Sequence, residues 1–425
     1  MIKESEYKKR RESLSSSLKK NSITLLFSAE IKNRSNDTEY PYRQNSNFYY
    51  LTGFKEDSSA LMIVKTDKET YTYLLISKKD KKLELWNGKR YGIKKAKKNF
   101  TFDNVFEYQN LLTIFQKNST SKTKLYYDFS TLDHIIKPFK QVAKQCDSYT
   151  NISKKIQLLR LRKSKSEINL IKNAINITKM AHHRAMKSSY SLNNEYELQA
   201  EIEYIFKKNN AYSDAYSSIV ACGNAANTLH YITNNKPLKK GSLILIDAGC
   251  EYKYYASDIT RTIPVNGKFT QAQRELYQLV LNVEKEIIKM IKPGVLRSDL
   301  HKKSEELLCQ GMVKFSILKG DVKKLLKHKA HKKYYPHGIG HWMGLDVHDE
   351  APYIDTKGDE IPLLPGMVLT IEPGIYIDKD DQSVPNKYRG IGIRIEDNIL
   401  VTKDSYENLS YAIVKEIGDI EALSF

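Results

Sequence analysis

LILIDAGCEYKYYASDITRT, residues 243–262, places two aspartates in strand-like surroundings. Asp247 ends an apolar run, and Asp258 follows in a second run of β character. If the chain folds back about Tyr252 and Lys253, the two aspartates face each other across a hairpin, where opposed Cβ atoms lie about 5 Å apart. Two such carboxylates repel each other unless a cation lies between them. The stretch therefore indicates a hairpin with a cation site; the alternative is one buried and one solvated aspartate.

Two further acidic residues lie in apolar β-like runs: Glu372 in VLTIEPGIY and Glu396 in GIGIRIEDNIL. An unpaired carboxylate would be costly to bury in either run. Four carboxylates and one imidazole suit two divalent ions, because formal charges of about −4 and +4 cancel. The oxygen-rich set favours Mn²⁺, with Co²⁺ or Zn²⁺ as possible substitutes.

The segment YYPHGIGHWMGLDVHD, residues 334–349, is rich in histidine. His337 and His341 have the spacing of the zinc-binding helix HExxH, but Gly338 replaces its glutamate. Two glycines and a preceding proline disfavour a helix, so the chelating geometry of that motif is not expected. A single histidine is more often structural than catalytic. His348 and, further upstream, His230 in NTLHY strengthen the functional interpretation.

Composition narrows the class of protein. A chain of 425 residues with 40% hydrophobic residues predicts two domains rather than one. The net charge of +19 comes from lysines spread along the whole chain, so we expect no nucleic-acid partner. With no secretory segment and no run of 18 apolar residues, we expect a cytoplasmic protein without a membrane partner. The four cysteines form no CxxC pair and are expected to be reduced thiols.

The pattern of elements changes once along the chain. Up to about residue 150, the β-like runs SITLLFS, SALMIV, TYTYLLIS and KLYYDF alternate with helical stretches, which predicts a small α/β domain. A long helical pattern follows, with Ser164 or Ser166 as its N-cap. Helices then precede β-rich segments, with a helical insert near 270–330. An α+β architecture follows, with domains at 1–160 and 161–425.

Several of these stretches together resemble the aminopeptidase P (Xaa-Pro aminopeptidase) family of the creatinase/methionine aminopeptidase "pita-bread" metallopeptidases. They are IDAGCEYKYYASDITRTIPVNGKFT, HGIGHWMGLDVHD, VLTIEPGIY and YRGIGIRIEDNILVT. EYPYRQNSNFYYLTGF and LELWNGKRYG resemble the family's N-terminal domain, so the similarity covers nearly the whole chain. The resemblance implies a creatinase-like N-terminal domain for oligomerisation and active-site capping, followed by a pita-bread catalytic domain with two metal ions. It also implies removal of the first residue from peptides with proline in second place.

The resemblance implies a role for each site residue. Asp247 would bind one metal ion, Asp258 and Glu396 would bridge both ions, and His341 and Glu372 would complete the other. A water or hydroxide between the ions would be the nucleophile, with its pKa lowered by the cations. Glu372 would act as general base and then as proton donor to the proline nitrogen.

Substrate contacts are implied in the same way. His230 and His348 would hold the scissile peptide and help to stabilise its oxyanion. The proline ring would be received by His337, Tyr376 and Arg394. The family also implies a homo-oligomer, a dimer or a tetramer, in which the counterpart of Trp86 can reach a neighbouring active site. Asn47 and Asn87 depart from the family pattern, where an acidic and an aromatic residue are expected.

Three alternatives remain open at this stage. A prolidase would share the metal ligands but take only dipeptides, whose C-terminal carboxylate it must bind. A methionine aminopeptidase would not need so large an N-terminal domain. Pita-bread proteins without activity serve as binding modules, some with nucleic acid, but these typically lose metal ligands, and all five positions are filled here.

Overall fold

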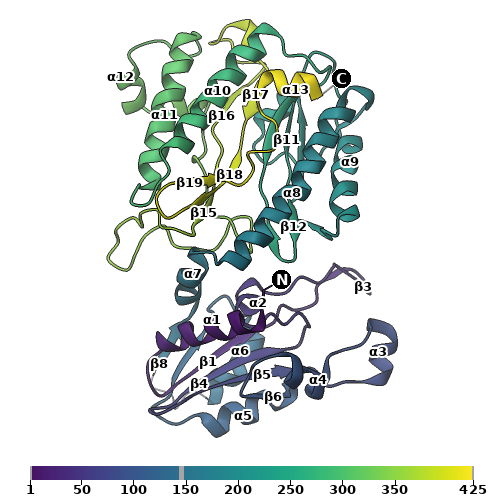
Figure 1. The fold of residues 1–425 in the computed structure, drawn as a ribbon, viewed down its shortest axis with the longest axis vertical. Coiled ribbons are helices and arrows are strands. Elements are labelled where there is room, and N and C mark those ends of the chain that lie inside the picture. The colour runs from purple at the N-terminus through teal and green to yellow at the C-terminus, as the bar shows by residue number, and fades with distance from the viewer. Residues whose placement is uncertain (1, 143–147, 424–425) are drawn as a thin grey trace. The chain divides into compact units, whose positions relative to one another are not determined.

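The computed structural model describes residues 2–142 and 148–423 (Figure 1). The chain divides into two compact units, residues 1–160 and 161–425. Cys222, Cys250 and Cys309 are buried and free, and Cys146 lies outside the described residues.

The first unit contains a six-stranded sheet of order β6-β5-β4-β1-β7-β8. Its strands are β1 (Ser22–Phe27), β4 (Ala60–Lys65), β5 (Thr70–Ile76), β6 (Asn104–Glu107), β7 (Lys124–Tyr127) and β8 (Ser148–Asn151). The four predicted β-like runs form β1, β4, β5 and β7, so that prediction is confirmed. β1 pairs antiparallel with β4 and parallel with β7, as in a mixed α/β sheet.

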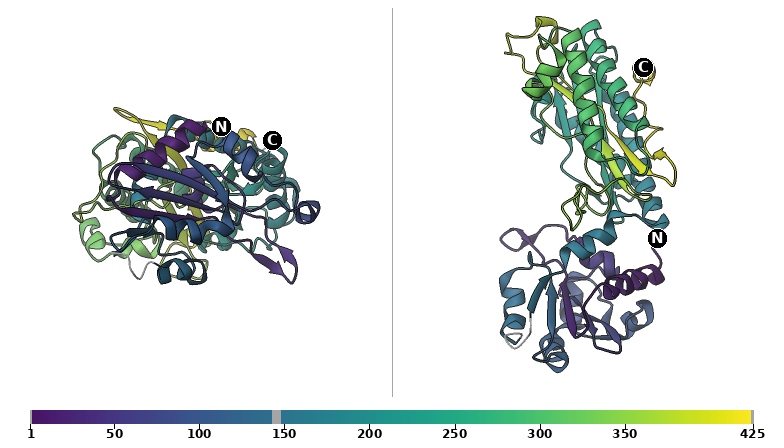
Figure 2. Two further views of the ribbon diagram at one scale, coloured as in Figure 1. Left: turned by 90° about the horizontal axis from the view of Figure 1, so that it is seen from below. Right: turned by 90° about the vertical axis from the view of Figure 1, so that its left-hand side faces the viewer.

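Helices cover both faces of this sheet (Figure 2). On one face, α5 (Leu111–Asn118) and α6 (Asp133–Val142) contribute Phe115 and Phe139 to the core beneath them. The helices α1 (Glu4–Ser16) and α2 (Ser46–Thr52) lie on the other face. This part of the chain also contains β2 (Asn33–Ser35), β3 (Thr38–Glu39), α3 (Lys81–Asn87), α4 (Gly92–Asn99) and α7 (Ser153–Leu161).

Four long helices lie on two sides of the strands in the second unit (Figure 1). The helices are α8 (Lys165–Ser188) and α9 (Glu195–Lys208) on one side, and α10 (Gln271–Lys289) and α11 (Arg297–Lys314) on the other. Ser164 precedes α8, and its hydroxyl accepts from the Glu167 N–H while the Glu167 carboxylate accepts from the Ser164 N–H. This capping box confirms Ser164 as the N-cap. With α12 (Val322–Lys327), α10 and α11 form the predicted helical insert, and α13 (Ile417–Leu423) ends the described chain.

The strands of the second unit form short antiparallel sheets. One sheet is β10 (Ile219–Cys222), β11 (Leu243–Asp247) and β14 (Thr260–Pro264); another is β15 (Val368–Ile371), β18 (Asp397–Val401) and β19 (Tyr406–Asn408). β16 (Gly374–Ile377) pairs with β17 (Ile391–Arg394), and β12 (Cys250–Tyr252) lies between β9 (Ser213–Asp214) and β13 (Tyr255–Ala256). Apolar side chains from the strands and from α8–α11 form one continuous core.

The hairpin of the opening stretch forms, but its predicted register is wrong. The turn is at Lys253 and Tyr254, whose φ angles of 51° and 75° suit a two-residue turn of the type that matches strand twist. Asp247 therefore pairs with Thr260, not Asp258, which lies in the irregular segment between β13 and β14. The strands pass closely here, since a Cβ on Gly249 would lie 1.9 Å from the Ser257 carbonyl oxygen.

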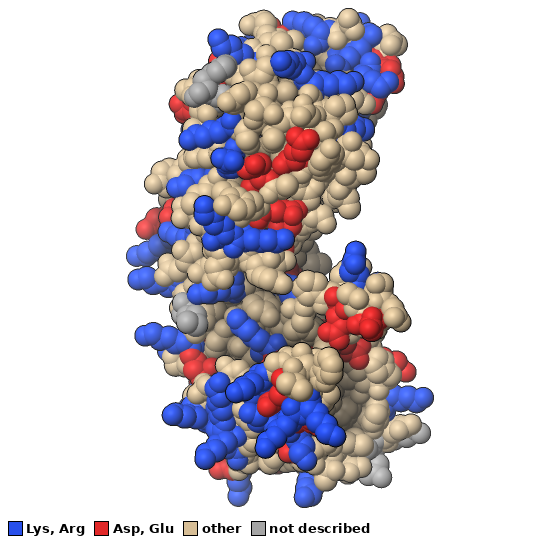
Figure 3. All heavy atoms as spheres, turned by 90° about the vertical axis from the view of Figure 1, so that its right-hand side faces the viewer, with Lys and Arg blue, Asp and Glu red and all other residues tan. Residues whose placement is uncertain are grey.

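The surface bears charges of both signs. On the face shown in Figure 3, lysine and arginine are spread over both units, with acidic side chains between them. In α3, Trp86 is 84% exposed. Among the helices that the structure describes, none combines the length and apolar character that a membrane crossing requires.

Candidate functional site

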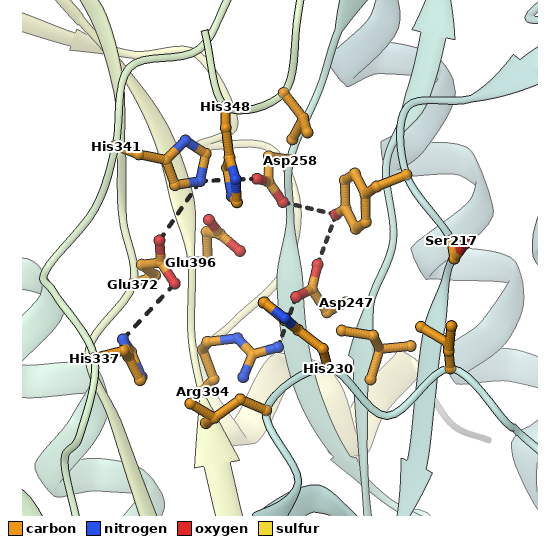
Figure 4. Close-up of a pocket in the computed structure, with 15 residues that line it drawn as sticks. Ser217, His230, Asp247, Asp258, His337, His341, His348, Glu372, Arg394 and Glu396 are labelled. Atoms are coloured by element: carbon orange, nitrogen blue, oxygen red, sulfur yellow. Dashed lines mark hydrogen bonds and ion pairs between the residues drawn. The ribbon is translucent and has the colours of Figure 1, made fainter. Parts of the chain in front are cut away.

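A cavity of about 350 Å³ in the second unit brings the predicted residues together (Figure 4). Nine of the ten predicted side chains line it, and Tyr376 lies next to it, hydrogen-bonded to both His337 and Arg394. The lining consists of Tyr216, Ser217, Ile219, Leu229, His230, Ile232, Asp247, Asp258, His337, His341, Val347, His348, Glu372, Arg394 and Glu396.

The cavity lies where several strands end. Asp247 closes β11, Glu372 follows β15, and Glu396 separates β17 from β18. The Glu396 N–H donates to the Thr260 carbonyl at 3.1 Å, which links the β17–β18 connection to β14. These backbone positions are fixed by buried strands, so the fold holds the carboxylates together against their mutual repulsion.

Three residues place potential metal-binding oxygen and nitrogen atoms close together. Asp258, His341 and Glu396 each present an atom within 4.8 Å of the others. Asp247 joins them through Tyr216, whose hydroxyl lies 2.6 Å from Asp247 Oδ1 and 2.7 Å from Asp258 Oδ1. This tyrosine was not predicted, because nothing in its sequence surroundings marks it.

His341 is oriented as a ligand. Its Nδ1 lies 3.0 Å from the Trp342 carbonyl oxygen, which can only accept, so Nδ1 bears the proton and Nε2 is directed to the carboxylates. Nε2 lies 3.2 Å from Asp258 Oδ2 and 3.6 Å from Glu372 Oε1. Burial lowers the pKa of His341, but the hydrogen bond and charge of Asp258 and the charge of Glu372 outweigh it and raise the pKa to about 9.

His337 is hydrogen-bonded to uncharged groups, unlike His341. Its Nδ1 lies 2.8 Å from the Gly338 carbonyl oxygen, and its Nε2 lies 2.8 Å from the Tyr376 hydroxyl. Both ring nitrogens are therefore engaged, and the nearest Glu372 oxygen is 3.9 Å away. Burial and the charge of Arg394 lower the pKa of His337 to about 3, so the ring is neutral. The segment 336–341 contains no helix, as expected from its glycines.

Arg394 links the two sides of the cavity. Its Nη2 donates to Asp247 Oδ2 at 2.6 Å, and its Nη1 donates to the Tyr376 hydroxyl at 2.9 Å. Its Nε donates to the Thr260 hydroxyl, which in turn donates to Glu396 Oε2 at 2.7 Å. One guanidinium thus positions two of the carboxylates and the tyrosine beside His337.

The acidic side chains that line the cavity outnumber its positively charged side chains. Burial, with the charge of Asp258, raises the pKa of Glu396 well above its usual range and also raises that of Asp247. Burial raises the pKa of Glu372 to about 7, against the lowering effects of His341 and Arg394. Excess negative charge, oxygen donors and one oriented imidazole are what divalent ions require. The residues therefore fit a metal centre.

His230 and His348 lie at the open side of the cavity, and both are exposed. The His348 ring meets the His341 ring edge to face, with centroids 4.1 Å apart. Neither histidine belongs to the tight group of Asp258, His341 and Glu396. Their place suits contact with a bound molecule better than coordination of an ion.

Gly340 allows His341 to approach β15. A Cβ on Gly340 would lie 1.9 Å from the Thr370 carbonyl oxygen, and the neighbouring His341 N–H donates to the Thr370 hydroxyl. We expect Gly340→Ala to lower the free energy of unfolding by about 3 kcal/mol, because the added methyl group would force the main chain at Gly340 away from the main chain at Thr370. Urea unfolding would measure this loss. Gly418→Ala, with nothing within 4 Å of its Cβ, is the control, and equal stability of the two variants would contradict the prediction.

Two family models match the chain. The model of metallopeptidase family M24 matches residues 169–403, and that of the aminopeptidase P N-terminal domain matches residues 7–126. Among curated proteins, the Xaa-Pro aminopeptidase of Haemophilus influenzae is 40% identical, over 98% of this chain and 96% of its own length. That of Escherichia coli is 38% identical, over 99% and 98%.

Solved structures give the same similarity. Zinc-substituted E. coli aminopeptidase P in complex with product aligns with a TM-score of 0.96 at 37% identity, covering 100% of this chain and 98% of the other. The E. coli enzyme with the inhibitor Pro-Leu aligns with a TM-score of 0.95 at 38% identity, with the same coverage. These matches confirm the predicted fold class, an α/β N-terminal domain followed by a pita-bread domain.

Proposed function

The chain belongs to metallopeptidase family M24 with the activity of a Xaa-Pro aminopeptidase, and we propose that its cavity binds and cleaves the peptide substrate at a dinuclear metal centre. The observation that supports this most is that two histidines of the cavity have different partners and oppositely shifted pKa values. His341 faces the carboxylates, whereas His337 is neutral and bound to Tyr376. The cavity thus has a carboxylate-rich part for ions and, at His337, a neutral imidazole for a proline ring.

Five residues would hold two divalent ions: Asp247, Asp258, His341, Glu372 and Glu396. The oxygen-rich donor set favours Mn²⁺ over Co²⁺ or Zn²⁺. When bound, the ions lower the pKa of a water molecule and polarise the scissile carbonyl. Asp258 and Glu372, which raise the pKa of His341 to about 9, would favour a bound cation for the same electrostatic reason.

Glu372 is the proposed general base. Oε1 accepts from the Thr370 hydroxyl at 3.2 Å and lies near His341, while Oε2 lies toward His337. The carboxylate therefore lies between the metal side and the proline side of the cavity. It can take a proton from the attacking water and deliver it to the proline nitrogen, which becomes basic as the peptide bond breaks. His230 and His348, at the open side, hold the peptide and stabilise its oxyanion.

The proline side is proposed to consist of His337, Tyr376 and Arg394. An Xaa-Pro bond lacks an N–H, so it offers no donor for the strand-like pairing that other proteases use. The neutral imidazole of His337 presents an uncharged ring to the proline, and Tyr376, held by Arg394, fixes that imidazole through a hydrogen bond. Arg394 is already engaged by Asp247 and Tyr376, and no other arginine or lysine lines the described cavity. A dipeptide carboxylate would find no free cation there, which disfavours the prolidase alternative.

We propose a homo-oligomer, a dimer or a tetramer, with the first unit taking part in its contacts and in capping the active site. The exposed Trp86 and its neighbour Leu85, 82% exposed, are apolar surface that a second subunit could cover. A cytoplasmic location stays a prediction.

A peptide panel would test the proposed activity. We expect release of the first residue from Xaa-Pro-Yaa tripeptides, with cleavage of matched Xaa-Ala-Yaa peptides at least about a hundredfold slower, because only a proline ring fills the space beside His337. Rates measured after chelation and reloading with Mn²⁺, Co²⁺ or Zn²⁺ would rank the metals. Cleavage of Xaa-Pro dipeptides alone would favour a prolidase, and unimpaired function without metal would favour a binding module.

A further inference from the structure

The cavity has an apolar part to which the reaction assigns no role. Ile219, Leu229, Ile232 and Val347 line it together with Ser217. In Figure 4, Ser217 lies at the opposite margin of the cavity from His337, with His230 and Asp247 between them in this view. If the proline ring occupies the His337 side, as proposed above, the residue before it extends to the side of Ser217 and His230.

Ile232 is the most exposed of these apolar side chains. It is 57% exposed at the mouth of the cavity, two residues after His230. Leu229 and Val347 are half-buried and Ile219 is buried, so they form a wall behind it. An exposed isoleucine beside a ligand cavity gains stability only when a ligand covers it, because apolar surface is then removed from water.

The backbone at Ile232 is held in place. Tyr231 is buried and its hydroxyl donates to Glu195 Oε2 at 2.8 Å. Asn234 is 1% exposed, and its amide donates to the Ser218 carbonyl at 2.7 Å. Ile232 thus projects from a loop fixed on both sides, which is the arrangement that discriminates between ligands.

We propose that Ile232, backed by Ile219, Leu229 and Val347, is a specificity-determining residue that favours an apolar side chain at the first residue of the peptide. The inference rests on the proposed activity and adds the chemistry of the residue released. Ile219, Leu229, Ile232 and Val347 carry no charge, and the acidic side chains that line the described cavity are all assigned above to the metal ions. A charged first residue therefore finds no partner on the apolar part, whereas leucine or valine covers Ile232.

The test compares kcat/KM for Leu-Pro-Yaa, Arg-Pro-Yaa and Gly-Pro-Yaa peptides in manganese-loaded protein. Each kcat/KM is divided by that for the glycine peptide measured with the same variant. A smaller fraction of folded or metal-loaded protein then lowers both values equally and leaves the ratio unchanged. We expect the wild type to prefer leucine to glycine by roughly tenfold or more, since a few methylene groups are worth that much. Ile232→Ala should lower this ratio severalfold, and Ile232→Glu should raise the arginine-to-leucine ratio about tenfold.

Leu132→Glu is the matched control, because Leu132 is a similarly exposed aliphatic residue (53%) that does not line the cavity. Its ratios should equal those of the wild type. Unchanged ratios in both Ile232 variants, or a change that follows the third residue instead of the first, would overturn the inference. Ser217→Phe adds a second measurement: narrowing the same side should penalise leucine more than glycine. If the wild type cleaves none of the peptides, the proposed activity itself has failed.

Discussion

Asp258→Asn is expected to remove metal binding and peptidase activity together while leaving the fold intact. Asp258 lies within 3.2 Å of His341 Nε2 and belongs to the tight ligand group with Glu396. An amide in its place lacks the negative charge that Asp258 would supply to a bound metal ion. Loss of an outer contact to a metal ligand typically costs 10–100-fold, so loss of a ligand itself should lower kcat/KM by roughly a thousandfold or more.

Elemental analysis, a Xaa-Pro-Yaa assay and thermal unfolding of the metal-free proteins would check this result. The metal-free variant should unfold at or above the temperature of the metal-free wild type, because one of four mutually repelling carboxylates is gone. Asp404→Asn, on an exposed turn after β18, is the control and should retain metal and activity. An Asp258→Asn protein that is fully active without its metal would refute the assigned centre.

Removal of the metal is expected to make stability depend on pH. Burial raises the pKa of Glu372 from 4.5 to about 7 and raises those of Asp247 and Glu396. A carboxyl with a raised pKa binds its proton more tightly in the folded chain than in the unfolded chain. Its stabilising contribution is complete below pH 4.5 and is lost as pH rises through 7. For Glu372 alone this is about 3 kcal/mol.

The metal-loaded protein should lack this loss, because cations replace the protons. The difference in free energy of unfolding between manganese-loaded and chelated protein should therefore grow from pH 5 to pH 8. Urea titrations at four pH values would measure it, and buried acids elsewhere, such as Glu284 beside Lys415, cancel in the difference. Glu372→Gln should reduce the slope of the chelated form. A chelated protein whose stability rises over this range would contradict the assignment.

The sequence predicted the participants better than their arrangement. Acidic residues inside apolar strands and histidines among glycines have recognisable surroundings, so the cavity contains the residues expected of it. The hairpin register was missed because its turn uses Lys253 and Tyr254 at positive φ, where glycine or asparagine would have marked the turn. Because the turn is centred one residue later than predicted, the partner of Asp247 is Thr260 and not Asp258, although Asp258 still reaches Asp247 through Tyr216.

Contacts between distant segments could not be predicted. Tyr216 precedes Asp247 by 31 positions, and only the fold brings its hydroxyl to two carboxylates. Nothing in the sequence distinguishes Ile232 from the other isoleucines; only the structure shows that it is exposed and lines the cavity. Capping is local, and Ser164 was therefore predictable from a few neighbouring residues.

The position of Arg394 has a thermodynamic consequence. A single guanidinium touches the carboxylate of Asp247 on one side and the hydroxyl of Tyr376 on the other. A ligand that fixes the guanidinium from one side would restrict its motion on the other, so binding of metal and binding of proline would be coupled. Such coupling is reciprocal: if bound proline raises the affinity for the ions by some factor, the bound ions raise the affinity for proline by the same factor. Redesigning the enzyme to accept a residue other than proline would then alter its affinity for metal as well.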